Sequence, residues 1–299
     1  MRMSCIIILL LAVFTSALGQ DYSPQWIYAP HADSTSHIWY RKAFISKERP
    51  KQATITVTST GYYKLYVNEC NIGTAVYYPA KDKTDSSAVT TTLDITAYLR
   101  QDTNVVAIVY SPSFPAISQR QIAVSVYGKD TEGKSFCYTT DGSWLCQRAN
   151  SRLQDDGKGE IVDGRTYDPE WKAATIPNQA LWMPAMTYYD NSSLPLTSHK
   201  AMVANHIMDW SFYNDNKSRD SMKVDYSFYG FPRVTIREAK RGEKIRINNL
   251  LYICNGEIDE QAFPLFNTAF FGNISISGKT NIVTTIEAIE LKQQLLENY

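Results

Sequence analysis

The sequence predicts an all-β protein made of two antiparallel β-sandwich domains with a short C-terminal helix. Three observations support this fold class. Short segments of alternating apolar and polar residues, rich in β-branched and aromatic side chains, recur along the 299 residues. Glycine, asparagine, aspartate and proline separate them, as turns between strands require. Long stretches with helical periodicity are missing, which favours sandwiches over alternating strands and helices.

Residues 1–19 have the pattern of a secretory signal peptide. Arg2 gives a basic start, residues 6–14 form a nine-residue apolar run, and residues 17–19 (Ala-Leu-Gly) form a small-x-small cleavage site. This run is about half of the ~20 residues that a membrane-spanning helix needs, and no later run is as apolar for as long. We therefore expect a mature chain that begins near Gln20, has no membrane span and is secreted or periplasmic.

The first domain is expected to span residues 20–197. One helical turn is predicted over residues 93–99. Residues 149–198 contain several prolines and glycines and little strand pattern, so they are interpreted as an irregular wrapping segment before the domain boundary. The clearest strands are predicted over residues 53–58, 62–67, 104–110 and 121–127.

The second domain is expected to span residues 198–299. Residues 239–243 contain Gly242 and are predicted to be a hairpin loop between two strands. The tail over residues 287–297 is predicted to be a short helix, which needs packing against the rest of the protein to be stable. Strands are predicted over residues 222–228, 232–238, 244–254, 273–277 and 282–291.

Charge and composition narrow the possible partners. The chain has 30 Lys and Arg against 30 Asp and Glu, a formal net charge of zero, which leaves no basic face suited to many phosphates. Nucleic acid is therefore not expected as a partner. The 20 tyrosines, six tryptophans and eleven phenylalanines suit both half-buried strands and sugar-facing surfaces.

Four cysteines lie beyond the signal-like segment, where a disulfide can form in an oxidising compartment. Cys137 and Cys146 flank the turn at residues 140–143 of a predicted hairpin and are the best candidates for a bridge. Buried unpaired thiols are the alternative. No C-x-x-C spacing is present and the histidines do not cluster with cysteines in sequence, so a zinc site is not expected.

The acidic residues offer one candidate metal site. Residues 155–160 (Asp-Asp-Gly-Lys-Gly-Glu), followed by Asp163, form an oxygen-rich loop of the kind that binds calcium. A solvated acidic loop is the alternative. The Gly-x-Ser-x-Gly motif and the phosphate-binding glycine loops are absent from the sequence, so serine-hydrolase and nucleotide chemistry are not expected.

A series of motifs follows a fixed order along the first domain. These are residues 26–27 (WI), 39–44 (WYRKAF), 61–68 (GYYKLYVN) with 72–73 (IG), 93–99 (LDITAYL), 104–107 (NVVA), 141–144 (DGSW) and 159–165 (GEIVDGR) with Trp171. The series resembles the N-terminal accessory region of bacterial α-L-rhamnosidases of glycoside hydrolase family 78, and the last two motifs are the most specific. Residues 225–234 and 270–278 are similar to strands of the next sandwich in that family.

The resemblance covers most of residues 25–290 and implies sandwiches of the galactose-binding or jelly-roll type. Family members continue into an α/α barrel that carries paired acid and base glutamates, which this sequence does not contain, so the resemblance implies a non-catalytic protein. The glycine that follows Asn68 in the family is Glu69 here, a residue less free to adopt a positive φ.

The leading hypothesis is a secreted, non-catalytic carbohydrate-binding or accessory protein that recognises or helps degrade polysaccharide, with rhamnose-containing glycans as the implied ligand. The candidate ligand-binding residues, at or beside the matching motifs, are Asn68, Tyr77, Tyr78, Asp163 and Arg165.

Other interpretations stay open. Asp163 and Arg165 can instead form a structural ion pair and Asn68 can close a turn, while Trp144 and Trp171 belong to the core. Two other functions are also compatible with the sequence. One is a rhamnosidase-type hydrolase fragment or split-enzyme subunit with a partner enzyme, and the other is a structural protein-interaction module.

Overall fold

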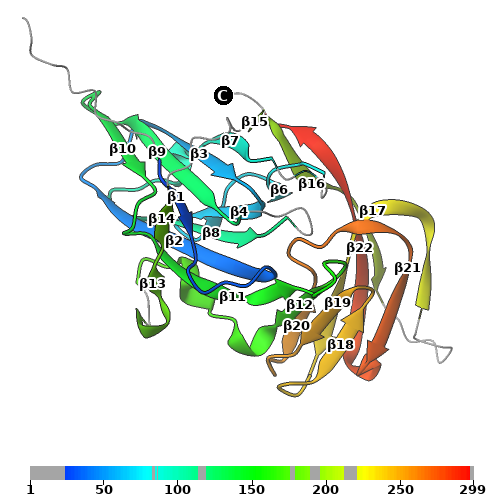
Figure 1. Ribbon diagram of the computed structural model, residues 1–299. Helices are drawn as coiled ribbons and strands as arrows, with labels where there is room; N and C mark the ends of the chain where they lie inside the picture. Colours follow the sequence, from blue (N-terminus) through cyan, green and yellow to red (C-terminus); the bar gives the residue numbers. More distant parts are fainter. Residues whose placement is uncertain are drawn as a thin grey trace, which may run out of the picture.

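A computed structural model describes residues 24–82, 85, 87–113, 119–175, 179–188, 196–211 and 221–296. In this part of the chain the protein is all-β (Figure 1), and its helical elements are 3₁₀ turns of three or four residues. The signal-like residues 1–19 lie outside the described residues. None of the described helices is long and apolar enough to cross a membrane.

The first sheet has seven strands and is built by the first half of the chain, residues 24–188, apart from the short edge strand β15. Its order is β14-β1-β9-β3-β7-β15, with β10 paired to β9. All pairs are antiparallel except β15 with β7. Its strands are β1 (Trp26–Tyr28), β3 (Gln52–Ser59), β7 (Val89–Asp94), β9 (Ile122–Lys129), β10 (Ser135–Thr139), β14 (Met186–Tyr188) and β15 (Leu196–Thr197).

The second sheet has fifteen strands and runs through both halves of the molecule. Its order is β5-β4-β8-β2-β11-β12-β19-β18-β21-β17-β22-β16-β6, with β13 paired to β11 and β20 to β17. From the first half come β2 (Ser36–Ser46), β4 (Tyr62–Val67), β5 (Cys70–Asn71), β6 (Ala75–Tyr77), β8 (Asp102–Ser111), β11 (Leu145–Leu153), β12 (Glu160–Asp163) and β13 (Met183–Pro184). From the second half, residues 196–296, come β16 (Lys200–Ser211), β17 (Ser221–Arg237), β18 (Lys244–Ile247), β19 (Leu250–Ile253), β20 (Asp259–Ala262), β21 (Ala269–Gly278) and β22 (Val283–Leu295).

Short 3₁₀ turns connect some of these strands. Two of these turns contribute residues to the candidate site, and both follow β12 along the chain. The turns are η1 (Thr96–Tyr98), η2 (Gly164–Thr166), η3 (Pro169–Lys172), η4 (Gln179–Leu181) and η5 (Thr280–Ile282).

Alternation of side chains builds the core of the first half. In β3 the residues Ala53, Ile55 and Val57 are fully buried, and in β4 the residues Leu65 and Val67 are as well. They belong to one cluster with buried residues of β2, β8 and β9. Each fully buried Ile, Leu or Val side chain among them stabilises the fold by about 1.5–3 kcal/mol. The strands predicted over residues 53–58, 62–67, 104–110 and 121–127 are confirmed as β3, β4, β8 and β9, of which β9 begins one residue later than predicted, at Ile122.

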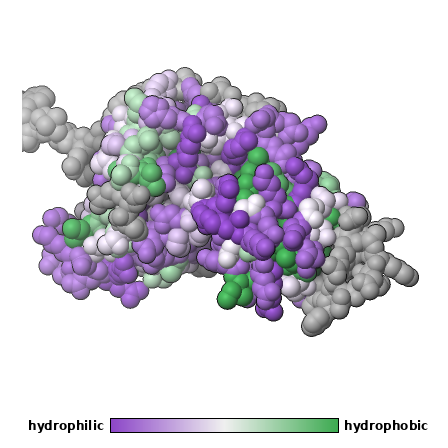
Figure 2. Space-filling view, turned by 90° about the horizontal axis from the view of Figure 1, so that it is seen from below, coloured by the Kyte–Doolittle hydropathy of each residue, from purple (hydrophilic) through white to green (hydrophobic). Residues whose placement is uncertain are grey.

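Two further clusters complete the interior. One lies in the second half, around residues such as Val234, Ile245 and Ile274. The other joins the two halves, because Trp39 on β2 and Phe231 on β17 belong to the same buried cluster. Pairing of β16 with both β6 and β22 also links the halves across the predicted boundary near residue 198. On the outside, Figure 2 shows a largely hydrophilic face on which hydrophobic groups are small and separate.

The strands predicted in the second half are present with different boundaries. The two segments predicted over residues 222–228 and 232–238 form the single long strand β17, and residues 244–254 are divided into β18 and β19. The hairpin predicted at residues 239–243 is wrong, because this loop joins β17 to β18, and β21 lies between those two strands in the sheet.

The predicted C-terminal helix is also wrong. Residues 287–295 of that segment belong to strand β22, which pairs with β16 on one side and β17 on the other. Ile286, Ala288 and Leu291 are buried there. A short isolated helix is marginal in water, whereas a strand between two neighbours has its backbone groups satisfied on both sides.

Both sheets are mixed, because β12 pairs in parallel with β19 and β15 pairs in parallel with β7. The prediction of antiparallel sheets therefore holds only in part.

The predicted disulfide is not formed. Cys137 lies on β10 in the first sheet, and Cys146 lies on β11 in the second sheet. The residues between them therefore connect two sheets and do not close a hairpin. All four described cysteines are free thiols, and burial raises the pKa of Cys146 to about 11. Cys146 is fully buried and behaves as a small core residue.

Candidate functional site

A cleft of about 730 Å³ lies between the two halves of the molecule. The first half contributes β2, β4 and the turns η2 and η3, and the second half contributes residues around β19 and β20. Its aromatic lining consists of Trp39, Tyr66, Tyr167, Trp171, Tyr252 and Phe263. Its charged lining consists of Lys64, Arg165, Lys172, Arg241, Glu257, Asp259 and Glu260.

Glu160, on β12, fixes one wall of this cleft. Its fully buried carboxylate accepts hydrogen bonds from the backbone N–H groups of Leu265 at 2.8 Å, Phe266 at 3.0 Å and Asn267 at 2.9 Å. Burial raises the pKa of the Glu160 carboxyl, against the three N–H bonds and the charge of Lys64, which lower it. One side chain of the first half thus holds a loop of the second half in place.

Lys64 and His37 lie beside this anchor and pack against the ring of Phe266. The ammonium group of Lys64 lies 5.8 Å from the centre of the Phe266 ring, and burial lowers the pKa of Lys64 to about 8. The His37 ring packs edge-on against the same ring at 5.1 Å, and its Nδ1 lies 2.8 Å from Ser151 Oγ. His37 Nε2 is buried without a hydrogen-bond partner among the described residues. Burial, with repulsion from Lys64, lowers the pKa of His37 to about 3, so the ring is neutral at pH 7.

Asp163 and Arg165 form an ion pair at the start of η2. Arg165 donates to the Asp163 carboxylate from Nε at 2.9 Å and from Nη2 at 2.7 Å, and the Arg165 backbone N–H also donates to it. The hydrogen bond from the guanidinium group is the main cause that lowers the pKa of Asp163. Arg241 of the second half donates to the Arg165 carbonyl at 2.8 Å. Between the pair, Gly164 is required because a Cβ there would lie 2.9 Å from the carbonyl oxygen of Ile253.

Several aromatic side chains of the cleft pack against one another and hold its walls in place. Trp171 stacks on Trp39 with 5.3 Å between ring centres, and both are buried. Arg41 donates to the Trp171 carbonyl at 3.2 Å and so ties η3 to β2. Tyr167 packs edge-on against Trp39 at 6.3 Å and is 47% exposed. It is the aromatic ring of the cleft that is most accessible to a ligand.

Lys172 adds a cation beside these rings. Its ammonium group lies 4.3 Å from the centre of the Tyr66 ring and 5.9 Å from that of Trp171. It forms no ion pair within the described part of the chain. Burial lowers the pKa of Lys172.

The predicted site residues are not brought together. Arg165 lines the cleft, and its ion pair with Asp163 keeps the Arg165 side chain in that position. Asn68 instead closes the turn between β4 and β5, where its amide donates to the Tyr98 carbonyl and to Asn104 Oδ1, both at 2.8 Å, and accepts from the Val105 N–H. Asn68 and Glu69 have φ values of 50° and 70°, so the turn keeps the left-handed conformation without glycine.

Tyr77 and Tyr78 are buried. The Tyr77 hydroxyl lies 3.1 Å from Thr268 Oγ1, and the Tyr78 hydroxyl donates to the Ile72 carbonyl at 2.9 Å. Neither lines the cleft. The residues that sequence reasoning missed are Lys64, Tyr66, Tyr167 and Lys172. The alternation of residues 62–67 places Lys64 and Tyr66 on the same strand face, which was an available signal.

The acidic loop predicted to bind calcium does not gather its carboxylates. Asp155 pairs with Arg152, Asp156 accepts from the Lys158 N–H, and Glu160 and Asp163 have the partners described above. Within the described ranges, no group of three or more His, Cys, Asp or Glu side chains is placed to hold a metal ion. This part of the structure therefore offers no ligand set for the predicted calcium.

Comparisons with known proteins agree with this architecture. A family model described as the α-L-rhamnosidase N-terminal domain matches residues 48–206. A search of curated proteins found no match.

Solved structures show the same fold. The α-L-rhamnosidase from Dictyoglumus thermophilum is 17% identical with a TM-score of 0.75, covering 91% of this chain and 36% of that one. The enzyme from Aspergillus terreus is 16% identical with a TM-score of 0.74 and the same coverage. The Streptomyces avermitilis enzyme complexed with L-rhamnose is 13% identical with a TM-score of 0.73, covering 86% and 29%. The chain thus spans about a third of the length of these enzymes.

Proposed function

We propose a function from the premise that the chain belongs to the α-L-rhamnosidase N-terminal domain family. The protein is a secreted or periplasmic, non-catalytic module that binds carbohydrate in the cleft between its halves and assists the recognition or degradation of polysaccharide. Rhamnose-containing glycans are the proposed ligands, because one similar structure holds L-rhamnose.

The cleft geometry is the observation that supports binding. Its volume of about 730 Å³ lies within the 300–1,000 Å³ of ordinary ligand pockets. The exposed ring of Tyr167 offers a face for stacking, and Lys172 offers donors for sugar hydroxyl groups. Tyr167 and Lys172 both belong to the segment that follows the motif at residues 159–165. The most specific part of the family pattern is therefore adjacent in sequence to these two residues of the cleft.

The carboxylates of the cleft support a non-catalytic role. Glycoside hydrolysis needs two carboxyl groups that face one sugar. Here Asp259 pairs with Arg237, and Glu260 accepts from the Asn255 and Gly256 N–H groups and from the Tyr252 hydroxyl. Among the described lining residues, Glu257 is the carboxylate that has no such bond, and a single carboxylate does not make an acid and base pair.

Removing the exposed ring tests the proposed site. We expect Tyr167→Ala to weaken binding of a rhamnosylated oligosaccharide at least tenfold, because an aromatic contact with a sugar face contributes on the order of 1.5 kcal/mol. Isothermal calorimetry on the chain from Gln20 measures this. Tyr127→Ala is the matched control, since Tyr127 is 44% exposed on β9 and does not line the cleft. Equal affinity of the Tyr167→Ala variant and the wild-type protein would contradict the site.

Metal removal gives a second check. Because the described residues hold no ligand set for a cation, we expect the same calorimetric affinity in about 1 mM calcium, a concentration suited to weak extracellular sites, and in excess chelator. A loss of binding in chelator that calcium restores would show instead that the protein uses a metal to hold its ligand.

A further inference from the structure

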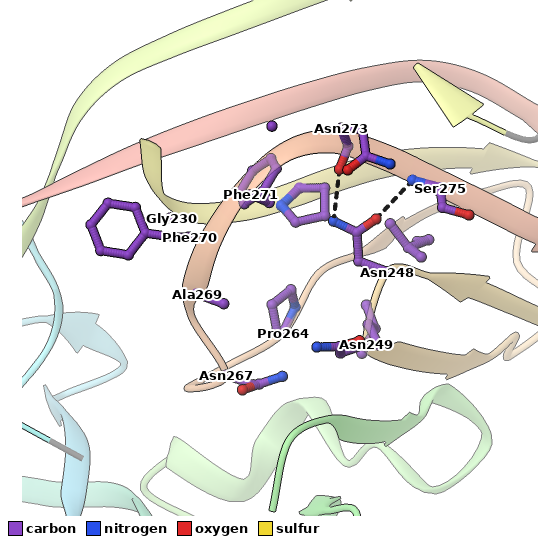
Figure 3. Close-up of a pocket in the computed structure, with 14 residues that line it drawn as sticks. Gly230, Asn248, Asn249, Pro264, Asn267, Ala269, Phe270, Phe271, Asn273 and Ser275 are labelled. Atoms are coloured by element: carbon purple, nitrogen blue, oxygen red, sulfur yellow. Dashed lines mark hydrogen bonds between the residues drawn. The ribbon is translucent and has the colours of Figure 1, made fainter. Parts of the chain in front are cut away.

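A second pocket of about 510 Å³ lies in the second half of the molecule. It is bordered by the turn between β18 and β19, the loop after β20 and strands β17 and β21 (Figure 3). Pro264 and Asn267 of the loop line this pocket, whereas Phe263 and Leu265 of the same loop line the cleft. One loop, anchored by Glu160, therefore borders two separate cavities.

The chemistry of this second pocket differs from that of the cleft. None of its fourteen described lining residues is charged, although a fifth of the whole sequence is. Four of them are asparagines and two are phenylalanines, namely Asn248, Asn249, Asn267, Asn273, Phe270 and Phe271. We call this cavity the amide pocket. Figure 3 shows the four asparagine side chains around it and Phe270 at one end.

Two of the asparagines are fixed by the fold. Asn248 donates to the Asn273 carbonyl at 3.3 Å and accepts from the Ser275 N–H at 2.7 Å, as the dashed lines in Figure 3 mark. Asn267 donates to the Lys158 carbonyl at 3.0 Å. These bonds set the shape of the pocket.

The side chains of Asn249 and Asn273 are available to a ligand. Both residues are exposed, and neither side-chain amide has a hydrogen bond to a described residue. An amide offers a donor and an acceptor on one planar group, which matches a sugar hydroxyl that both donates and accepts. Two such groups that line one pocket provide directional contacts without any net charge.

Phe270 supplies an apolar face at the same place. It is 77% exposed, and its ring is held edge-on by Tyr229 at 5.4 Å. A single exposed aromatic residue is common on protein surfaces. Here, however, the ring borders an uncharged cavity with available amides. This combination of a flat apolar surface and neutral hydrogen-bonding groups matches the apolar face and the hydroxyl groups of a pyranose.

We propose that the amide pocket is a second carbohydrate site, specific for neutral saccharides. The absence of charge among its described lining residues decides the ligand class, because nothing there offsets the desolvation of a carboxylate, a phosphate or an ammonium group. Its volume accommodates a small saccharide. The site is independent of Tyr167 and of the charged cleft.

The test uses the Tyr167→Ala variant, in which binding at the cleft is expected to be at least tenfold weaker. The probes are neutral disaccharides of rhamnose, galactose, glucose and mannose, with di-galacturonate as the acidic probe, measured by saturation-transfer NMR and calorimetry. In this background we expect a neutral disaccharide to bind. Adding Phe270→Ala or Asn249→Ala is expected to weaken that binding at least tenfold. The control Ile258→Ala changes a side chain that is 74% exposed and does not line the pocket, and it is expected to have no effect.

The amide pocket and the cleft can fail independently in this experiment. Binding that survives Tyr167→Ala and is lost with Phe270→Ala supports the amide pocket whatever the cleft binds. No binding of any neutral probe, equal binding after Phe270→Ala and Asn249→Ala, or stronger binding of di-galacturonate than of neutral probes would overturn it. Circular dichroism of each variant checks that the fold is kept, which is expected because Phe270 and Asn249 are exposed.

Discussion

Replacing Glu160 with Gln is expected to destabilise the protein by about 3–5 kcal/mol, the usual effect of removing one partner from a buried charged network. The carboxylate accepts three backbone N–H groups, from residues 265, 266 and 267. A Gln side chain has one acceptor oxygen and turns an NH₂ donor toward the remaining N–H groups. At least one buried N–H group then loses its partner, which costs about 1–3 kcal/mol, and half-buried Lys64 loses the attraction of a nearby negative charge.

Urea unfolding followed by tryptophan fluorescence measures this change. The control is Glu132→Gln, a residue whose side chain is exposed in the turn after β9, where we expect a change within about 0.5 kcal/mol. A loss of less than about 1 kcal/mol for Glu160→Gln would show that the loop does not depend on this carboxylate.

Acid is expected to destabilise the protein through His37. The pKa of this residue is about 3 in the folded protein, because burial disfavours the charged ring, against an ordinary value of 6.5. The unfolded chain therefore binds a proton below pH 6.5 that the folded protein does not bind until about pH 3. The contribution to stability is complete above the unfolded pKa and falls with pH through this window, at up to about 1.4 kcal/mol per pH unit.

The difference between the wild-type protein and a His37→Asn variant isolates this effect from other titrating groups. Unfolding free energies measured from about pH 7 to about pH 4.5 are expected to fall more steeply for the wild-type protein, by about 2.5 kcal/mol over that range. His199→Asn serves as the control, because His199 is exposed, and it is expected to keep the wild-type slope. Parallel slopes for the wild-type and His37→Asn proteins would contradict the assignment of a neutral buried ring.

Local patterns predicted much of the fold. The alternation in residues 53–58 and 62–67 is a property of neighbouring residues, and both segments are strands whose apolar positions are buried. The segment over residues 287–297 shows the opposite case, because its apolar residues fit a helix, yet pairing with β16 and β17 makes most of it a strand. Such pairing joins residues far apart in sequence and leaves no local signal.

The candidate site was predicted less well for the same reason. The motif at residues 159–165 identified the correct wall of the cleft, but the partners of Glu160 lie 105 and more residues further along the chain. Parallel pairing of Glu160 with Leu250 brings the two halves together there. Asn68, in contrast, belongs to a motif with a local structural role, since its amide is used to close a turn.

A calorimetric titration of the chain from Gln20 with rhamnose and rhamnosylated oligosaccharides tests the proposed function most directly. We predict saturable binding that Tyr167→Ala weakens at least tenfold while Tyr127→Ala leaves it unchanged, and no hydrolysis of the ligand during the experiment. No binding of any rhamnosylated ligand, or release of free rhamnose from it, would contradict the role of a non-catalytic carbohydrate-binding module.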